Sequence, residues 1–422
     1  MMSSHGHRTC PVHATFDPLA KSFLDDPFAV LASLPRETPV FYAPSIDYYV
    51  VTRYADIKSV FLDSETYSAA LTQMPLVELA PQAAQILLGG GHKLQPSMVS
   101  VDPPAHTRLR TPTARAFTPE RVARMEPRIR LTINQLLNDI DPSSPFNLVA
   151  ALTFPLPATM IFSFLGIPEH DWPQLKEWCG HRAVLGFGRP TPEEQVLRAP
   201  QVAAYRRYLT TFVAAKATAR ADDFTSALLA IHDENPHALT HEEISSIVYG
   251  LTFAGHETTN YLIGNLVYRL LVKTERWDAV VADPKLIPAA VDETLRYDPP
   301  IPAWRRVTRR PVTLGGVDLP EGAKLFLWLA ASGRDASVFP APESFDLQRA
   351  DASKSLAFGL GIHYCLGAAL GKLEARLALE ALTTRFPGLC LVAGQELSYP
   401  PNISFRGPQS LWVRASQEPQ MR

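Results

Sequence analysis

The segment from Phe358 to Gly367 most constrains what this chain can fold into. It reads Phe-Gly-Leu-Gly-Ile-His-Tyr-Cys-Leu-Gly and leads directly into a run of strong helix formers, Ala368 to Leu382. Cys365 is therefore expected at a helix N-terminus, where unpaired N–H groups and the helix dipole favour an anionic sulfur. Gly359, Gly361 and Gly367 leave space beside the backbone, and some of them are expected to need a positive φ. The segment predicts a thiolate that faces a bulky, flat group.

A lone cysteine is more often a small buried apolar residue than a ligand. The full pattern Phe-Gly-x-Gly-x-His-x-Cys-x-Gly is far more specific, and it resembles the haem-binding loop of the cytochrome P-450 monooxygenases. The resemblance implies a fold that is mainly α with small β-sheets, and haem b (iron protoporphyrin IX) as the cofactor. The iron would take the thiolate of Cys365 as its proximal ligand, which favours O–O cleavage. Phe358, Gly359, His363 and Gly367 would line the haem, with His363 donating to an anionic edge.

Length and composition favour one large globular unit. The chain has 422 residues, 46% of them hydrophobic and 19% charged, and no linker or repeat marks a boundary. We expect a disordered tail over residues 1–14 and a single haem domain over residues 15–422. Four cysteines without paired spacing indicate neither disulfides nor a zinc site, and a reducing cytoplasm fits them best.

Charge and hydropathy also limit the partners. The net charge of −2 argues against a nucleic-acid binder. The N-terminus lacks a basic segment followed by an apolar stretch, so we expect neither a secretory signal nor a membrane anchor. The most hydrophobic region, residues 148–166, contains prolines and hydroxyl residues, which favour a buried helix over a membrane span.

A second motif lies on a long predicted helix. Thr240-His-Glu-Glu243 is a capping box, and the apolar pattern that follows runs past Leu271, which predicts a helix of about thirty residues. A helix so long and apolar must cross the core. Near its middle stands Phe253-Ala-Gly-His-Glu-Thr-Thr259, where a glycine costs helix stability.

Thr258 follows Ala254 by four residues, so its hydroxyl can bond the Ala254 carbonyl and loosen the helix there. The plain alternative is a tolerated kink with a solvent-facing Glu257. The pattern resembles the oxygen-binding groove of the P-450 family, with Ala254 and Gly255 beside the haem. That resemblance implies that Thr258 hydrogen-bonds dioxygen and that Glu257 helps to relay protons. His256 is interpreted as a packing or solvent-exposed residue.

His106 and Arg110 stand four residues apart on one face of a predicted helix that opens at Asp102. A solvated helical face is the plain alternative. In the P-450 family the histidine and second arginine of this motif contact the haem propionates. Other arginines nearby, among them Arg108 and Arg115, would lie on the proximal surface and steer an acidic electron donor.

Arg306 precedes a predicted Gly315-Gly316 turn at the distance usual in the family, so it matches a further arginine that meets a haem propionate. A surface arginine remains the alternative.

Glu293-Thr-Leu-Arg296 alone would be a common surface pair. Its position matches the Glu-x-x-Arg signature of the P-450 family. The family usually adds a basic residue in a Pro-Glu-x-Phe segment, but this chain has Ser344 at that place. Arg349 is a candidate substitute, and the three-residue arrangement stays open.

The other expected elements follow from local patterns. They are a hairpin in 41–54, a short helix in 56–62, an irregular segment in 71–100 that covers the substrate, helices in 167–223 separated by prolines, strands in 312–330, and a final hairpin in 397–413 whose turn reaches the substrate pocket.

The implied reaction inserts one atom of O2 into a small organic substrate by hydroxylation or O-dealkylation. Electrons would come from a ferredoxin or from a flavin and iron–sulfur reductase. Residues 188–196, 303–308 and 401–408 look like the haem domain of self-sufficient bacterial P-450s fused to a phthalate-dioxygenase-type reductase. By that resemblance the substrates are small aromatic ethers, alkylarenes or thiocarbamates. With no dinucleotide fingerprint or cysteine cluster in it, the chain is interpreted as a free-standing relative or an excised domain. The alternatives are a peroxide-driven peroxygenase and a non-catalytic haem-based sensor.

Overall fold

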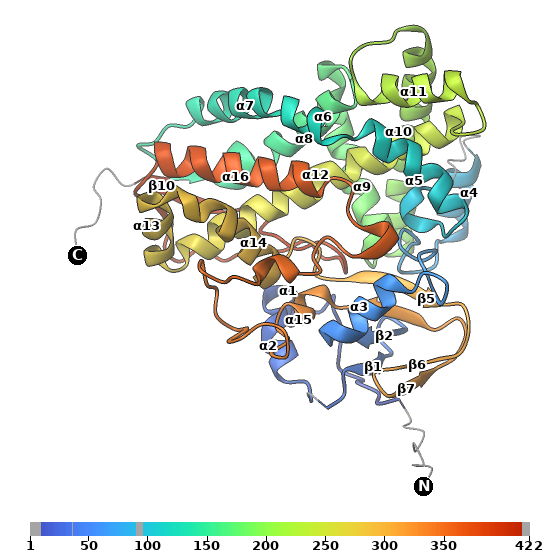
Figure 1. Ribbon diagram of the computed structural model, residues 1–422, viewed down its shortest axis with the longest axis horizontal. Coiled ribbons are helices and arrows are strands. Elements are labelled where there is room, and N and C mark those ends of the chain that lie inside the picture. Colours follow the sequence, from blue (N-terminus) through green and yellow to red (C-terminus); the bar gives the residue numbers. More distant parts are fainter. Residues whose placement is uncertain (1–9, 36, 90–95, 416–422) are drawn as a thin grey trace.

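Helices build most of the protein, as the sequence predicts (Figure 1). The computed structural model describes residues 10–35, 37–89 and 96–415. The helices are α1 (Lys21–Asp25), α2 (Pro27–Ala32), α3 (Tyr54–Leu62), α4 (Pro81–Gly89), α5 (Ala105–Ala116), α6 (Pro119–Arg124), α7 (Glu126–Asn138), α8 (Pro155–Phe164), α9 (Trp172–Phe187), α10 (Pro192–Thr218), α11 (Phe224–Glu234), α12 (His241–Leu271), α13 (Thr274–Ala282), α14 (Ile287–Tyr297), α15 (Leu329–Ser332) and α16 (Ala368–Arg385). No helix of the described part is both long enough and apolar enough to cross a membrane.

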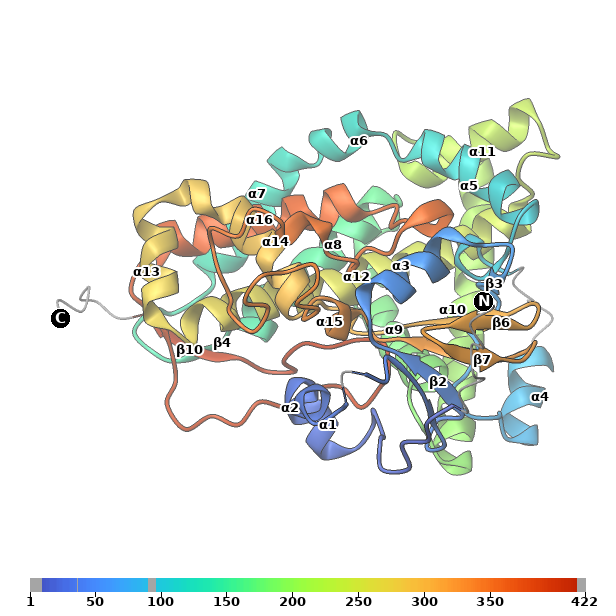
Figure 2. The same cartoon turned by 60° about the horizontal axis from the view of Figure 1, so that its bottom comes forward.

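The strands lie mainly at the side of the molecule opposite α7, α8 and α11 (Figures 1 and 2). They are β1 (Val40–Ala43), β2 (Tyr48–Val51), β3 (Tyr67–Ser68), β4 (Phe146–Asn147), β5 (Trp304–Thr308), β6 (Val312–Leu314), β7 (Val317–Leu319), β8 (Lys324–Leu327), β9 (Leu389–Leu391) and β10 (Trp412–Ala415). The largest sheet has the order β1-β2-β8-β5-β3, in which only β2 and β8 are parallel.

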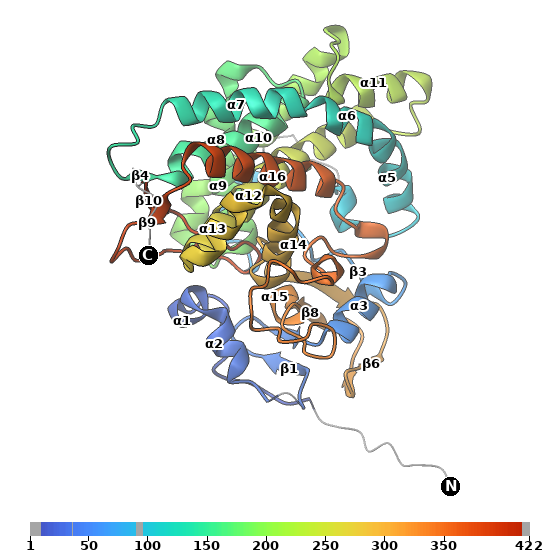
Figure 3. The same cartoon turned by 60° about the vertical axis from the view of Figure 1, so that its left-hand side comes forward.

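The predicted long helix is α12, which has 31 residues and crosses the core. Its capping box is complete: the Thr240 hydroxyl accepts from the N–H of Glu243, whose carboxylate accepts from the N–H of Thr240. Helices α8, α10, α14 and α16 pack around α12 (Figure 3). Glu243 also pairs with Arg108 of α5, at 2.9 Å between Arg108 Nη1 and Glu243 Oε2. The start of α12 is therefore fixed both to its own backbone and to α5.

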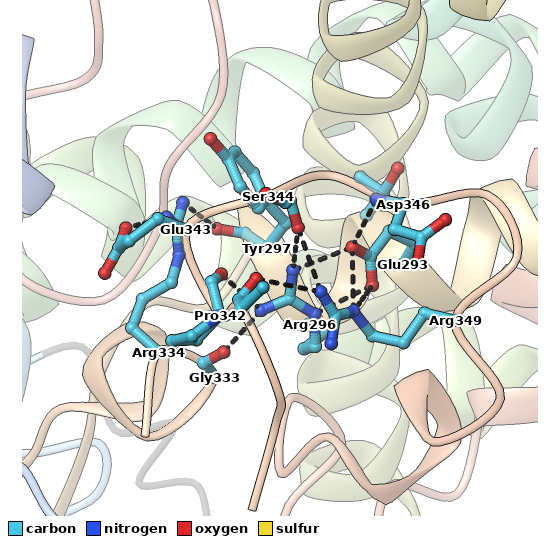
Figure 4. A network of polar contacts seen from close by, with 12 residues as sticks. Glu293, Arg296, Tyr297, Gly333, Arg334, Pro342, Glu343, Ser344, Asp346 and Arg349 are labelled. Carbon is cyan, nitrogen blue, oxygen red and sulfur yellow. Dashed lines mark hydrogen bonds and ion pairs between the residues drawn. The ribbon is translucent and has the colours of Figure 1, made fainter. Parts of the chain in front are cut away.

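The Glu-x-x-Arg pair is fully buried on α14, and a third residue joins it (Figure 4). Arg296 makes two bonds of 2.7 Å to the Glu293 carboxylate, and Arg349 Nε lies 3.2 Å from the same carboxylate. Arg296 and Arg349 also share the carbonyl of Ser344, at 2.8 and 3.1 Å. Arg349 therefore takes the place of the basic residue that position 344 lacks.

Three expectations need correction. The segment 71–100 is not irregular throughout, because α4 occupies part of it; Pro81 begins that helix, a position that proline tolerates. Residues 397–413 form no hairpin, since only β10 is a strand there and Pro400, Pro401 and Pro408 have no N–H to donate. Of the expected tail, residues 1–9 lie outside the described part, but residues 11–13 pair with Tyr42 of β1.

The remaining expectations agree with the structure. β1 and β2 form the N-terminal hairpin, followed by α3. β6 and β7 are joined by the Gly315-Gly316 turn, where both glycines have positive φ. Prolines separate α9 from α10, and residues 149–164 form a π-helical turn and α8, which are mostly buried.

Candidate active site

Cys365 lies in a tight loop directly before α16. Its N–H donates to the Phe358 carbonyl at 2.9 Å, which closes the loop, and Gly359 and Gly361 adopt the positive φ that the turn needs. A Cβ at Gly361 would lie 2.6 Å from the Phe61 carbonyl of α3, so only glycine fits there. Gly367 has φ −88° and open space beside it.

The environment of the Cys365 sulfur combines opposing effects. Burial raises the pKa of the Cys365 thiol, whereas the N–H groups of Gly367 and Ala368 and the charge of Arg110 lower it. These N–H groups belong to the start of α16, so the predicted placement at a helix N-terminus is confirmed. Burial has the larger effect, so the pKa of the Cys365 thiol is raised overall, and the donors that face the sulfur offset part of that rise.

His106, Arg110, Arg306 and His363 come together from three parts of the chain. The rings of His106 and His363 lie 4.3 Å apart, and both nitrogens of His106 and Nε2 of His363 are buried without a hydrogen-bond partner in the described structure. Burial, together with the neighbouring Arg306, lowers the pKa of His363 to about 3, and burial next to Arg110 also lowers the pKa of His106. Both rings are therefore neutral near pH 7, and each has an N–H to donate.

The two arginines of this cluster have no carboxylate partner among the described residues. Arg306 is 3% exposed and bonds only the Thr72 hydroxyl and the Arg305 carbonyl, and burial lowers its pKa to about 10. Arg110 donates to the Tyr364 carbonyl at 2.7 Å. The buried Arg306 cation beside unbonded ring N–H groups favours a bound anion, because an unpaired buried charge is costly.

On α12, the Thr258 hydroxyl donates to the Ala254 carbonyl at 2.8 Å, as predicted. Both residues line the same cavity as Cys365. Gly255 is required for packing: a Cβ there would lie 2.6 Å from the Ile161 side chain of α8. The Thr258 hydroxyl and the Ala254 carbonyl thus lie on the part of α12 that lines the cavity with the Cys365 loop.

Glu257 is buried rather than solvent facing, and it does not line this cavity. Burial raises the pKa of its carboxyl, and Tyr261 hydrogen-bonds it. His256 is fully buried against Phe154, with ring centroids 4.6 Å apart, so the packing interpretation is right and the exposed alternative is wrong. Burial lowers the pKa of His256 to about 3, so its 3.8 Å approach to Glu257 is not an ion pair at neutral pH.

Glu374 of α16 was not predicted as a site residue. It is 2% exposed, lines the cavity and has one carboxyl oxygen without a partner in the described structure. Burial raises its pKa well above the usual range and thereby favours the protonated carboxyl over the carboxylate. The signal for it was its place at the edge of the apolar stripe of α16, four residues after Leu370.

One cavity of about 240 Å³ is lined by Cys365, Thr258 and Glu374 together with most of the charged and imidazole groups; His106, His256 and Glu257 lie outside its lining. Its floor is the Cys365 loop with Gly359 and Gly367, one wall is α12, and His363, Arg110 and Arg306 line its edge. Its other walls are largely apolar and include Phe187, Phe253, Trp304 and Phe405. A larger and more open hollow of about 840 Å³ lies beside α13 and residues 340–351, but no predicted site residue lines it.

This arrangement defines a haem-thiolate protein. The residues present fit the cofactor: glycines leave the Cys365 side open, and the unbonded imidazoles, the buried Arg306 and the half-buried Arg110 match two propionates. The family model for cytochrome P-450 matches residues 205–390. A vitamin D(3) 25-hydroxylase of Pseudonocardia autotrophica is 35% identical over 93% of this chain and 94% of its own.

Two solved structures are similar to nearly the whole chain. The cytochrome P-450 called CREJ, in complex with (4-ethylphenyl) dihydrogen phosphate, has a TM-score of 0.90, 36% identity and coverage of 98% of this chain and 100% of its own. An intact type IV self-sufficient cytochrome P-450 monooxygenase has a TM-score of 0.92, 34% identity and coverage of 97% of this chain and 55% of its own. The chain belongs to the cytochrome P-450 family.

The chain is accordingly a haem-thiolate monooxygenase that uses dioxygen, an organic substrate and a redox partner, and the fold and family expectations are confirmed. The named activities of its relatives favour this function over the peroxygenase and sensor alternatives. The likeness to the haem domain of self-sufficient enzymes is confirmed as well.

Proposed function

We propose that this monooxygenase oxidises small, uncharged, largely aromatic substrates, with aromatic ethers, alkylarenes and thiocarbamates as the candidate classes. The observation that carries the proposal is the aromatic wall formed by Phe187, Phe253 and Phe405 above the Cys365 loop. Phe187 and Phe253 are stacked with centroids 5.9 Å apart, and Phe405 meets both edge-on, at 4.8 and 5.3 Å. Such a wall favours a flat ring by shape and by its π-system.

We infer that Cys365 is the proximal iron ligand and that Phe358, Gly359, Gly367, Ala254 and Gly255 surround the haem b. His106, Arg110, Arg306 and His363 hold its propionates, which supply the anion that this buried cluster lacks. The bound haem supplies the redox chemistry with dioxygen. Residues 15–422 are assigned to one haem domain.

Oxygen insertion also needs protons, since the second oxygen atom leaves as water after two electrons and two protons are taken up. We assign the donation of a hydrogen bond to dioxygen to the Thr258 hydroxyl, whose single O–H turns from the Ala254 carbonyl to do so. Glu257, which belongs to α12 but does not line the cavity, supplies protons to the Thr258 hydroxyl. Glu374 of α16 lines the cavity and is a second buried acid whose pKa burial raises.

The proposed electron donor is an acidic ferredoxin or a flavin and iron–sulfur reductase in the cytoplasm. Arg115 and Arg124 support this, because both are exposed and neither makes an ion pair with a described residue. Arg108, in contrast, is occupied by Glu243 and contributes less to steering.

Relatives have different substrates by name, which include vitamin D(3), 6-deoxyerythronolide B and an aryl phosphate. The apolar wall of this chain supports an uncharged substrate rather than the phosphate.

The test uses the haem-loaded full chain with a surrogate ferredoxin, its reductase and NADH. Anisole is expected to give phenol and formaldehyde, with one O2 consumed per turnover and NADH as the source of both electrons. The reduced, carbon-monoxide-treated protein is expected to show the red-shifted Soret band typical of a sulfur ligand, and Cys365→Ala is expected to remove it. A spectrum without that band, or turnover retained by Cys365→Ala, would sink the proposal.

A further inference from the structure

Arg305, the neighbour of Arg306 on β5, is a buried arginine that the haem cluster does not use. Adjacent side chains of a strand point to opposite faces, so Arg305 and Arg306 serve different sides of the sheet. Arg306 lines the cavity, whereas Arg305 is 1% exposed and does not.

The guanidinium of Arg305 binds the backbone of two separate segments. It donates to the carbonyls of Thr72 and Met74, at 3.0 and 2.8 Å, and weakly to the carbonyl of Gly186, at 3.4 Å. It also lies 5.4 Å from the ring centroid of Phe187. One cation therefore joins the segment before α4 to the end of α9.

These contacts surround two residues of the cavity wall. Thr72 and Met74 flank Gln73, and Gly186 precedes Phe187; Gln73 and Phe187 both line the cavity. No carboxylate of the described residues pairs with Arg305, and a buried charge without a counterion is costly. We therefore attribute the presence of this buried arginine to the backbone positions that it fixes.

Gln73 is held in a defined orientation. The Ser97 hydroxyl donates to Gln73 Oε1 at 2.9 Å, so the amide nitrogen keeps two N–H groups, and no described residue accepts from them. Apart from Ser97 and the groups assigned to haem, oxygen and protons, the described walls are apolar or belong to α12. Gln73 is thus a polar donor on a largely apolar surface, where the indole of Trp304 carries another N–H.

We propose that Gln73 determines specificity by donating a hydrogen bond from its side-chain amide to an acceptor oxygen of an uncharged aromatic substrate, and that Arg305 is the positioning residue that holds Gln73 and Phe187 in the wall. This inference rests on the proposed function, because it takes the cavity above Cys365 as the substrate site.

The test compares two probes of nearly equal shape, anisole and ethylbenzene, which differ by an ether oxygen in place of a methylene. Dissociation constants are measured with the haem-loaded protein from the change of the ferric spectrum as substrate displaces water. Gln73→Leu is expected to raise the dissociation constant of anisole by about three- to tenfold, the range for one neutral hydrogen bond. The dissociation constant of ethylbenzene should stay the same or fall. Gln174→Leu, the same change at an exposed position of α9, is expected to alter neither.

Arg305→Lys is expected to reduce the ratio of the two constants, because lysine cannot hold three carbonyls with a planar fork. In the background of Gln73→Leu it is expected to leave the ratio unchanged, since the residue through which it acts is gone. Arg309→Lys, at an exposed arginine beyond the end of β5, is the control. A general loss of stability would weaken the binding of both probes by the same factor and would leave the ratio of their dissociation constants unchanged.

The proposal is overturned if Gln73→Leu affects both probes equally or neither, or if wild-type protein responds to neither probe. The role of Arg305 is overturned if Arg305→Lys leaves the ratio of the two dissociation constants unchanged. It is also overturned if Arg305→Lys lowers this ratio by the same factor whether position 73 holds glutamine or leucine. Should Arg305→Lys not fold, Arg305→Gln and Ser97→Ala provide the same ratio, because each removes one support of Gln73. The reduced carbon monoxide band is recorded for every variant, and its absence in wild type would refute the proposed function instead.

Discussion

Arg349 approaches the Glu293 carboxylate to 3.2 Å, on a chain where Ser344 replaces the expected basic residue (Figure 4). Its side chain is 5% exposed, and it donates to three carbonyls as well, at Pro340, Ala341 and Ser344. The residue therefore completes the buried network and also fixes the loop that leads towards the Cys365 segment.

Arg349→Met is expected to lower the free energy of unfolding by about 3 kcal/mol, because it leaves part of a buried carboxylate and several carbonyls unpaired. Arg349→Lys should lose less, since it keeps the charge but not the fork. Urea unfolding monitored by fluorescence measures both, with Arg309→Met as the exposed control. Equal stability of Arg349→Met and wild type would contradict this role.

Thr258→Ala is expected to slow product formation by about a hundredfold, the lower end of the effect of a positioned proton-transfer group. NADH consumption should continue, with the electrons recovered as hydrogen peroxide. Thr258→Ser keeps the hydroxyl and should stay coupled. The measurement is the ratio of product and peroxide to NADH, and an unchanged ratio in Thr258→Ala would refute the assignment.

Arg306→Gln is expected to speed the transfer of haem to apomyoglobin by about ten- to a hundredfold, as expected for one charge-assisted hydrogen bond. Removing the charge leaves one propionate without its buried cation. Arg309→Gln, on the exposed surface, should transfer haem at the wild-type rate. If both variants lost haem equally slowly, Arg306 would not be a propionate ligand.

His256 predicts how stability depends on pH. Its pKa is about 3 in the folded protein and about 6.5 when unfolded, so below pH 6.5 the unfolded chain binds a proton that the folded chain does not. Stability should therefore fall as the pH drops from 6.5 towards 3, and this residue should account for about 2 kcal/mol between pH 7 and pH 5. His256→Phe should lose that part of the pH dependence in urea unfolding at the two pH values. An identical dependence in both proteins would show that the imidazole titrates normally.

Local patterns predicted the elements that carry the site. The capping box at Thr240 and the four-residue step from Ala254 to Thr258 use contacts within one helix, so the sequence determines them directly. The Cys365 loop could be predicted equally well, because its glycines and the helix that follows are adjacent in the chain.

Other parts of the site depend on tertiary packing. The contact of Arg349 with Glu293 joins residues far apart in the chain, and only the path of residues 333–351 brings them together. The distance from the Gly315-Gly316 turn singles out Arg306 as the arginine that faces the cavity, but nothing in the sequence indicates that its neighbour Arg305 holds the cavity wall. The burial of Glu257 follows from Tyr261 and the neighbouring helices rather than from its own motif.

Because Glu243 contacts both its own helix and α5, loss of the cofactor should affect the stability of the start of α12. The Glu243 carboxylate caps α12 and binds Arg108 of α5, the helix that also carries His106 and Arg110. Loss of haem should remove the propionate contacts of α5 and make this helix more mobile. The first turn of α12 should then become less stable, because Glu243 binds Arg108 of α5. Amide exchange should thus increase at residues 241–245 when haem is removed, well before the middle of that helix opens.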